Sequence, residues 1–178
     1  MQDTTSILRT EISMSFKVIV FSDSHGKTED MLKAAENERK DLSMLIHLGD
    51  NIRDAEVLEK NFPLIPVCTV PGNCDFPSFV FGDAEKFFTF GGVGFFVCHG
   101  HTCAVKAGME VLLSKAKAKC ASIALYGHTH IAKLETHGGV TILNPGSISL
   151  PRGTNKPPSY GKITLDMSNI KAEIVYIQ

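Results

Sequence analysis

Residues 16–26 read FKVIVFSDSHG, an apolar, β-branched run that ends in polar residues and a glycine. The run at 16–22 predicts a strand covered on both faces, because apolar residues dominate both of its sides. Residues 28–40 follow with a capping-type threonine, early acids and a basic end, which predicts a helix. A strand followed by such a helix predicts the start of a parallel βαβ unit.

The same alternation continues to residue 75. SMLIHLGD at 43–50 predicts a second strand, residues 51–62 a second helix, and IPVCTVPGNCD at 65–75 a third strand. Helices that alternate with apolar strands indicate parallel pairing with right-handed crossovers.

After residue 80 the pattern changes to hairpins. Paired glycines separate 85–90 from 93–101 and 132–137 from 140–147, which predicts two hairpins. A helix at 104–119 and a strand at 122–130 lie between them, and antiparallel strands at 160–167 and 171–178 end the chain. This order predicts one α/β domain with two packed mixed sheets and flanking helices.

The composition excludes several classes of protein. Of the 178 residues, 43% are hydrophobic and 21% are charged, which is typical of a globular chain and not of a disordered one. The 18 Lys and Arg nearly balance the 19 Asp and Glu, so no global charge attracts nucleic acid or anionic lipid. No apolar run is long enough for a membrane span. We expect neither a membrane nor a nucleic-acid partner, and homo-oligomerisation is left open.

The N-terminal segment and the cysteines bear on location. Residues 1–15 contain Asp3 and Glu11 and no signal-peptide core, so we expect a mobile extension before a folded domain at 16–178. The five cysteines lack paired CxxC spacing, which predicts reduced thiols, most of them buried. Both features favour a cytoplasmic protein.

Polar residues follow the ends of five of the predicted strands. Because ligands bind beyond the carboxyl ends of strands in α/β sheets, we expect these side chains to converge. A small residue adjoins nearly every one of them and would let the backbone turn sharply. Imidazoles with carboxylate and amide oxygens suit two divalent ions, namely Mn, Fe, Zn, Co or Ni. The residues concerned are Asp23, His25, Asp50, Asn73, His99, His128 and His130.

The motifs DSHG, GDN, GNCD, HGH, GHTH and NPGS occur in this order between residues 16 and about 152. In this order they resemble the metallophosphoesterase (calcineurin-like) superfamily, and its small bacterial and archaeal phosphodiesterases in particular. The resemblance implies a four-layer αββα sandwich. It also implies hydrolysis of a small phosphate ester, most simply a phosphodiester, by a metal-bridging hydroxide, with manganese as the expected metal.

The resemblance also assigns a role to each motif residue. One metal would be held by Asp23, His25 and His130, and the other by Asn73, His99 and His128. Asp50 would bridge the two ions.

One position departs from the broader family pattern. Many members have GNH at the third motif, whereas this chain has GNC, with Cys74 in place of the usual histidine. A thiol could donate a proton to the leaving group or only fill space, and we favour the spacer. His101 is the alternative polar assistant, so the candidate catalytic residues are Asn73, Cys74 and His101.

Two alternatives to an enzyme fit part of this pattern. The retromer subunit of the same fold also has HGH, GHTH and NPGS and serves as a protein-binding scaffold, but the full ligand set of this chain favours an enzyme. A closed structural zinc site fits poorly with so many oxygen ligands. His47 is expected to be a buried core histidine, His137 and Arg152 to be solvated, and the NPGS residues Asn144, Gly146 and Ser147 to support the site.

Overall fold

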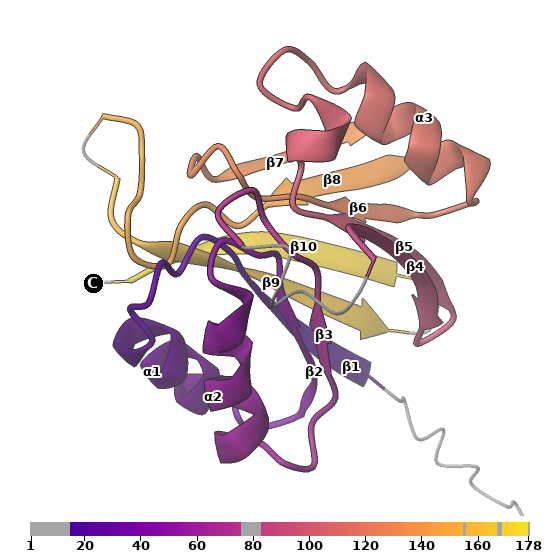
Figure 1. Ribbon diagram of the computed structural model, residues 1–178. Coiled ribbons are helices and arrows are strands. Elements are labelled where there is room, and N and C mark those ends of the chain that lie inside the picture. Colours follow the sequence, from indigo (N-terminus) through magenta and orange to yellow (C-terminus); the bar gives the residue numbers. More distant parts are fainter. Residues whose placement is uncertain (1–14, 76–82, 155, 167–168, 178) are drawn as a thin grey trace, which may run out of the picture.

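The computed structural model describes residues 15–75, 83–154, 156–166 and 169–177. These residues form two five-stranded sheets that pack face to face, with helices on both outer sides (Figure 1). Both sheets contain parallel and antiparallel pairs, as predicted.

The first sheet contains the predicted βαβ units. Its central strand β1 pairs in parallel with β2, and β2 with β3, while the closing strands β9 and β10 add antiparallel pairs beyond β1. Helices α1 and α2 connect the parallel strands and cover the outer face (Figure 1). The elements are β1 (Ser15–Phe21), α1 (Glu29–Asn37), β2 (Leu42–His47), α2 (Ala55–Asn61), β3 (Val67–Thr69), β9 (Ser159–Asp166) and β10 (Asn169–Tyr176).

The second sheet contains both predicted hairpins. Strands β4 and β5 form one and β7 and β8 the other, and β6 lies between β5 and β8, parallel to both. Helix α3 covers the outer face of this sheet (Figure 1). The elements are β4 (Glu85–Phe90), β5 (Val93–Cys98), α3 (Glu110–Ala118), β6 (Ile123–Leu125), β7 (Lys133–His137) and β8 (Val140–Asn144).

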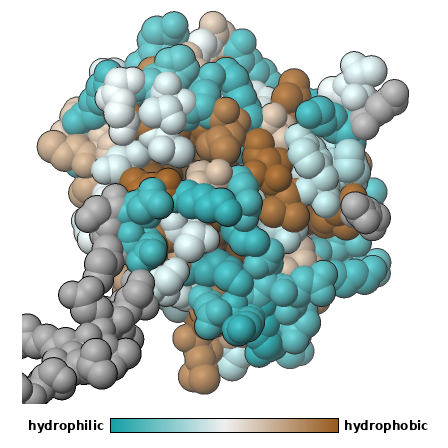
Figure 2. All heavy atoms as spheres, turned by 180° about the vertical axis from the view of Figure 1, so that it is seen from behind, coloured by the Kyte–Doolittle hydropathy of each residue, from teal (hydrophilic) through white to brown (hydrophobic). Residues whose placement is uncertain are grey.

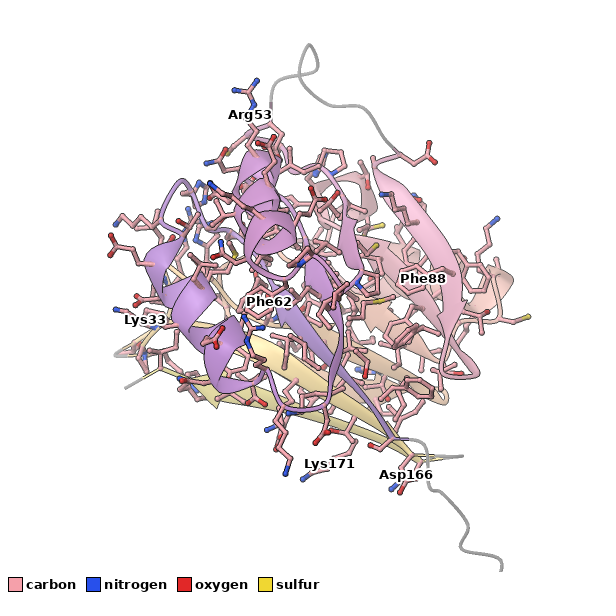
Figure 3. All side chains as sticks on the ribbon, turned by 90° about the horizontal axis from the view of Figure 1, so that it is seen from below. Lys33, Arg53, Phe62, Phe88, Asp166 and Lys171 are labelled. Carbon is pink, nitrogen blue, oxygen red and sulfur yellow. The ribbon has the colours of Figure 1, made fainter. Side chains whose placement is uncertain are left out.

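Strand β1 shows why the molecule has four layers. Val18 and Val20 point into the core between the sheets, whereas Ile19 and Phe21 pack under α1 and α2, and all four are fully buried. The period of two places apolar side chains on both faces. Figure 3 shows Phe62 beside the helices and Phe88 on the side of the second sheet. The predicted αββα sandwich is confirmed.

Several predicted elements are shorter than expected. The helix expected at 104–119 begins at Glu110, after a 3₁₀ turn at His101–Cys103, and Ala104 has a positive φ of 50° that no α-helix tolerates. The strand expected at 122–130 ends at Leu125, and His128 and His130 beyond it have positive φ, which a strand does not allow. The helix expected at 51–62 begins with a 3₁₀ turn at Ile52–Asp54. Loops and 3₁₀ turns with polar side chains take the place of the expected helical turns and strand residues.

The N-terminal prediction falls largely outside the described residues. Ser15 is expected from the sequence to belong to the extension at 1–15, but it is the first residue of strand β1. Residues 1–14 lie outside the described part. All five cysteines are free thiols, as predicted, but only Cys98 and Cys103 are buried. The expectation that most of them are buried is therefore wrong.

The surface mixes hydrophilic and apolar residues. Figure 2 shows one face, on which apolar residues form small groups between hydrophilic ones. Large hydrophobic side chains with high exposure include Leu64, at 93%, and Ile131, at 50%. No helix in the described ranges combines the length and apolarity needed to cross a membrane.

Candidate metal centre

The candidate site lies where strands of both sheets end. Asp23 and His25 follow β1 and Asp50 follows β2 in the first sheet, while His99 follows β5 in the second. The loop after β6 adds His128 and His130. Carboxyl ends of parallel strands meet at one edge, so residues spread over more than a hundred positions converge.

Four of the predicted ligands form one compact group. Donor atoms of Asp23, His25, Asp50 and His130 all lie within 4.8 Å of one another, and three of these four residues are buried. His130 Nε2 is 3.2 Å from Asp23 Oδ1, and His25 Nε2 is 3.3 Å from His130 Nε2. This group contains the three residues that the resemblance assigns to one metal, together with the proposed bridging carboxylate.

Two further histidines extend the group. His99 Nε2 lies 3.4 Å from Asp50 Oδ1 and 4.0 Å from Asp23 Oδ1. The His128 ring centroid is 5.2 Å from that of His99, and its backbone N–H donates to Asp23 Oδ2 at 3.1 Å. The structure thus places His99 beside both carboxylates of the group and His128 beside His99.

Hydrogen bonds at Nδ1 orient two of the histidines so that their Nε2 atoms face the group of candidate ligands. His99 Nδ1–H donates to the Leu48 carbonyl at 2.6 Å, and His130 Nδ1–H donates to the Leu150 carbonyl at 2.7 Å. Each ring therefore turns the Nε2 lone pair to the site, which is the arrangement found behind metal-bound histidines. Within the described residues, the buried atoms Asp23 Oδ1 and His99 Nε2 have no hydrogen-bond partner. The residues present fit divalent ions.

Charge and burial shift the pKa values in this group. Burial alone would raise the pKa of Asp23, but the His130 imidazole 3.2 Å away, the charge of His99 and a hydrogen bond from Ser22 lower it. Burial, and then His99, lower the pKa of His128 to about 4. Burial opposes the rise in the pKa of His130, and the nearby Asp23 carboxylate outweighs it. The shifts of Asp23 and His128 favour the ionised carboxylate and the neutral imidazole, the states that bind metal, whereas the shift of His130 favours the protonated ring that a bound cation would displace.

The backbone is unusual at the ligands themselves. Nine non-glycine residues in the described ranges have positive φ, and five of them are the candidate ligands Asp23, His25, Asp50, His128 and His130. Such conformations cost free energy and gather at functional sites. The expectation that neighbouring small residues make the turns is therefore incomplete, because the ligands themselves adopt the turning conformation.

Two of the glycines next to candidate ligands allow neighbouring loops to approach closely. A Cβ on Gly127 would lie 1.9 Å from Ser22 Oγ, and one on Gly72 would lie 2.1 Å from Asp50 Oδ1. Only glycine allows the loop after β6 to touch the end of β1 at this distance.

Of the three candidate catalytic residues, Cys74 and His101 contact members of the group, while the Asn73 side chain contacts Cys74. Asn73 is exposed, and its side-chain nitrogen contacts Cys74 Sγ at 3.3 Å. The exposed Cys74 is tied to the site by its backbone, whose N–H donates to Asp50 Oδ1 at 2.9 Å. Burial, then Asp50, raise the pKa of the Cys74 thiol to about 11. The ring of His101 is 5.4 Å from that of His99, and burial lowers its pKa.

Sequence reasoning missed the residue that organises two of the loops. Asp75 accepts hydrogen bonds from four backbone N–H groups, those of Asp50, Asn51, Ile52 and Gly72, at 2.7–3.1 Å. Asp54 does the same for Gly26 N–H at 2.8 Å. Asp75 is the last letter of the GNCD motif, and its spacing of three from Gly72 was the available signal.

The residues expected to have structural roles do have them. His47 is fully buried, donates from Nε2 to Ser24 Oγ at 2.9 Å, and accepts the Gly49 N–H at Nδ1.

The NPGS residues also have structural roles. Ser147 Oγ donates to the Asp23 carbonyl, and the Asn144 amide donates to the Gly127 carbonyl. The NPGS loop thus supports the loops that carry Asp23 and His128. His137 and Arg152 are exposed, as predicted.

Two mixed sheets with imidazoles and carboxylates at the strand ends are the arrangement that the resemblance to metallophosphoesterases implies. Comparison with known families identifies residues 16–168 as a calcineurin-like phosphoesterase superfamily domain, and the chain belongs to this family. The probable metallophosphoesterase YsnB of Bacillus subtilis is 35% identical over 149 residues, which cover 84% of each chain. The phosphodiesterase YfcE of Escherichia coli K12 is 42% identical over only 50 residues, 28% of this chain and 27% of its own.

Solved structures agree on the fold. A predicted phosphoesterase from Streptococcus pneumoniae TIGR4 superposes with a TM-score of 0.78 at 28% identity and covers 92% of this chain and 90% of its own. Vacuolar Protein Sorting 29 from Cryptosporidium parvum has a TM-score of 0.72 at 14% identity, covering 93% of this chain and all of its own. The second likeness shows the fold alone.

Proposed function

We propose that this chain is a phosphodiesterase that depends on two divalent ions, with manganese as the preferred metal. The observation that carries the proposal is the group of imidazole and carboxylate donors at the junction of the two sheets, with Asp23 Oδ1 and His99 Nε2 buried and unpartnered in the described structure. A buried acceptor without a donor is costly, and a cation satisfies several at once.

The residues divide into two ligand sets. Asp23, His25 and His130 would hold one ion, and Asn73, His99 and His128 the other. Asp50 would bridge the two, because one of its oxygens faces His25 at 3.8 Å and the other faces His99 at 3.4 Å. When bound, divalent ions supply Lewis-acid charge for the phosphoryl oxygens and lower the pKa of water toward neutrality.

Side chains of the site would orient the phosphate ester. The Nδ1 hydrogen bonds of His99 and His130 to backbone carbonyls keep both rings from rotating. His101, at the edge of the group beside His99 and His128, would contact an oxygen of the ester or of the leaving group. We favour His101 over Cys74 for this contact.

The preference for diesters and the cytoplasmic location belong to the same proposal. Diester cleavage is supported by the motifs shared with small phosphodiesterases and by the partial match to YfcE. Five free thiols suit a reducing compartment such as the cytoplasm.

The test is hydrolysis of bis-nitrophenyl phosphate by the purified protein with a panel of divalent ions. We expect activity with manganese and complete loss on chelation. Asp50→Asn should lower kcat at least a hundredfold and reduce bound metal, because a bridging carboxylate neutralises two cations at once.

Lys119→Ala is the matched control, since Lys119 is exposed at the end of α3 and should be silent. Unchanged turnover and metal content in Asp50→Asn would remove Asp50 from the site. Inactivity with every metal, combined with tight binding of a protein partner, would favour a scaffold instead.

A further inference from the structure

A pocket of about 400 Å³ opens beside the two-histidine loop. It lies between the segment before α3, the loop after β6 and the chain that follows β8. Thr129, which lines it, stands between His128 and His130 in the sequence. Arg152, on its other side, donates its backbone N–H to the His130 carbonyl at 3.0 Å. The pocket thus adjoins the loop that carries the candidate ligands His128 and His130.

The polar lining of this pocket carries positive charge. Lys106, Lys133 and Arg152 contribute to it, and the described residues that line it include no Asp or Glu. Lys133 is partly neutralised by Glu135, at 2.9 Å. Lys106 and Arg152 form no ion pair with any carboxylate in the described ranges, so their charges are available to a ligand.

The rest of the lining is apolar. Val105 and Tyr126 are buried, Met109 is half-buried and Ile131 is half exposed toward solvent. A volume of this size matches that of ordinary small-ligand pockets, in which apolar walls bind the body and a few polar groups fix the orientation.

We propose that this pocket binds the part of the phosphate ester beyond the scissile phosphorus, and that it selects substrates with a second anionic group on an apolar body. The inference rests on the proposed function, because the scissile phosphoryl group has to lie at the metal centre. Met109 and Ile131 contact the body of the substrate, while Lys106 and Arg152 pair with its carboxylate or second phosphate.

The test uses phosphonates, which cannot be hydrolysed, and measures binding by calorimetry with the manganese-loaded protein. Four benzylphosphonates differ only at the para position, which carries hydrogen, carboxylate, phosphonate or trimethylammonium. We expect both anionic compounds to bind about tenfold tighter than the unsubstituted one, and the cationic compound to bind most weakly. The difference between the carboxylate and the phosphonate compound shows which of the two anionic groups the pocket prefers.

Variants test the residues directly. Lys106→Met and Arg152→Met should each reduce the preference for the anionic compounds two- to fivefold, the range expected for solvent-exposed ion pairs. The double variant should reduce it about tenfold. Lys119→Met is the matched control and should leave the preference unchanged.

Three results would overturn the pocket assignment. They are equal binding of all four compounds by the unsubstituted protein, a preference that survives the double variant, and no binding by a protein that hydrolyses bis-nitrophenyl phosphate. Charge-selective binding without hydrolysis of any ester would instead contradict the proposed function and leave the pocket assignment standing.

Discussion

Cys74 is tied to the site by its backbone, and its thiol also lies close enough to Asp50 for this carboxylate to raise the thiol pKa. Its N–H donates to Asp50 Oδ1, an interaction that any residue except proline would keep, while its thiol is exposed and has a pKa raised to about 11. This arrangement supports the role of a spacer.

Cys74→Ala should therefore keep turnover of nitrophenyl and of alkyl diesters within a few fold. Nitrophenoxide leaves without a proton, whereas an alkoxide needs one, and general acid assistance is worth about 100- to 10,000-fold. Steady-state kinetics on both ester types, with metal content measured in parallel, check the prediction. A large loss confined to alkyl esters and restored by Cys74→His would identify the thiol as the acid.

His47 makes stability depend on pH. Burial lowers its pKa to about 4, because the enclosed ring would become charged without contact with water. The unfolded chain binds this proton below pH 6.5 and the folded chain does not, so stability is complete above pH 6.5 and falls as the pH drops toward 4. Through this group alone, the free energy of unfolding should be about 2 kcal/mol lower at pH 5 than at pH 7.5.

Urea unfolding at the two pH values checks this prediction with His47→Gln, whose amide can replace both hydrogen bonds without taking up a proton. The variant should lose most of this pH dependence. His137→Gln, at an exposed histidine, is the control and should keep it. An equal pH dependence in His47→Gln and the unsubstituted protein would show that His47 is not responsible.

At the scale of elements, the two sheets meet where β1 and β6 end. Gly127 follows β6 and leaves no room for a side chain against Ser22 and Asp23. Gly127→Ala should push the two loops apart, with a loss of about 1–3 kcal/mol in the free energy of unfolding and a clear loss of metal affinity. Denaturant unfolding and calorimetric titration of manganese measure the two effects.

The control is Gly139→Asn in the turn between β7 and β8. A Cβ there meets no atom within 4 Å, and asparagine tolerates the positive φ of 83°. This variant should keep full metal affinity. Normal affinity in Gly127→Ala would show that the loops can separate without damage to the site.

For the whole molecule, the candidate ligands come from both sheets. Asp23 and Asp50 follow strands of the first sheet, and His99, His128 and His130 follow strands of the second. A bound cation would join the two halves of the sandwich. Manganese at a hundredfold its Kd should add about 2.7 kcal/mol of stability, which raises Tm by about 5–10 °C.

Scanning calorimetry with and without manganese measures this shift. Asp50→Asn should abolish it and Lys119→Ala should keep it. An equal rise in Tm in Asp50→Asn would place the stabilising ion elsewhere.

The sequence by itself determined the class of fold and the residues that meet. Apolar runs of strand length, helices between them and paired glycines predicted both sheets and both hairpins, because these patterns act over neighbouring residues. Polar residues at strand ends predicted the candidate site, because parallel strands bring those ends to one edge. Asp23, His25, Asp50 and His130 come together for this reason.

Only the tertiary structure decided how the loops are held. Asp75 binds N–H groups more than twenty residues away in the sequence, and the strand expected at 122–130 ends at Leu125 so that His128 and His130 can turn toward Asp23. Helix α3 likewise begins only at Glu110, because Ala104 has a left-handed backbone conformation. Local propensity favours a longer helix and a longer strand, but contacts between distant loops impose left-handed backbone conformations that local sequence does not encode.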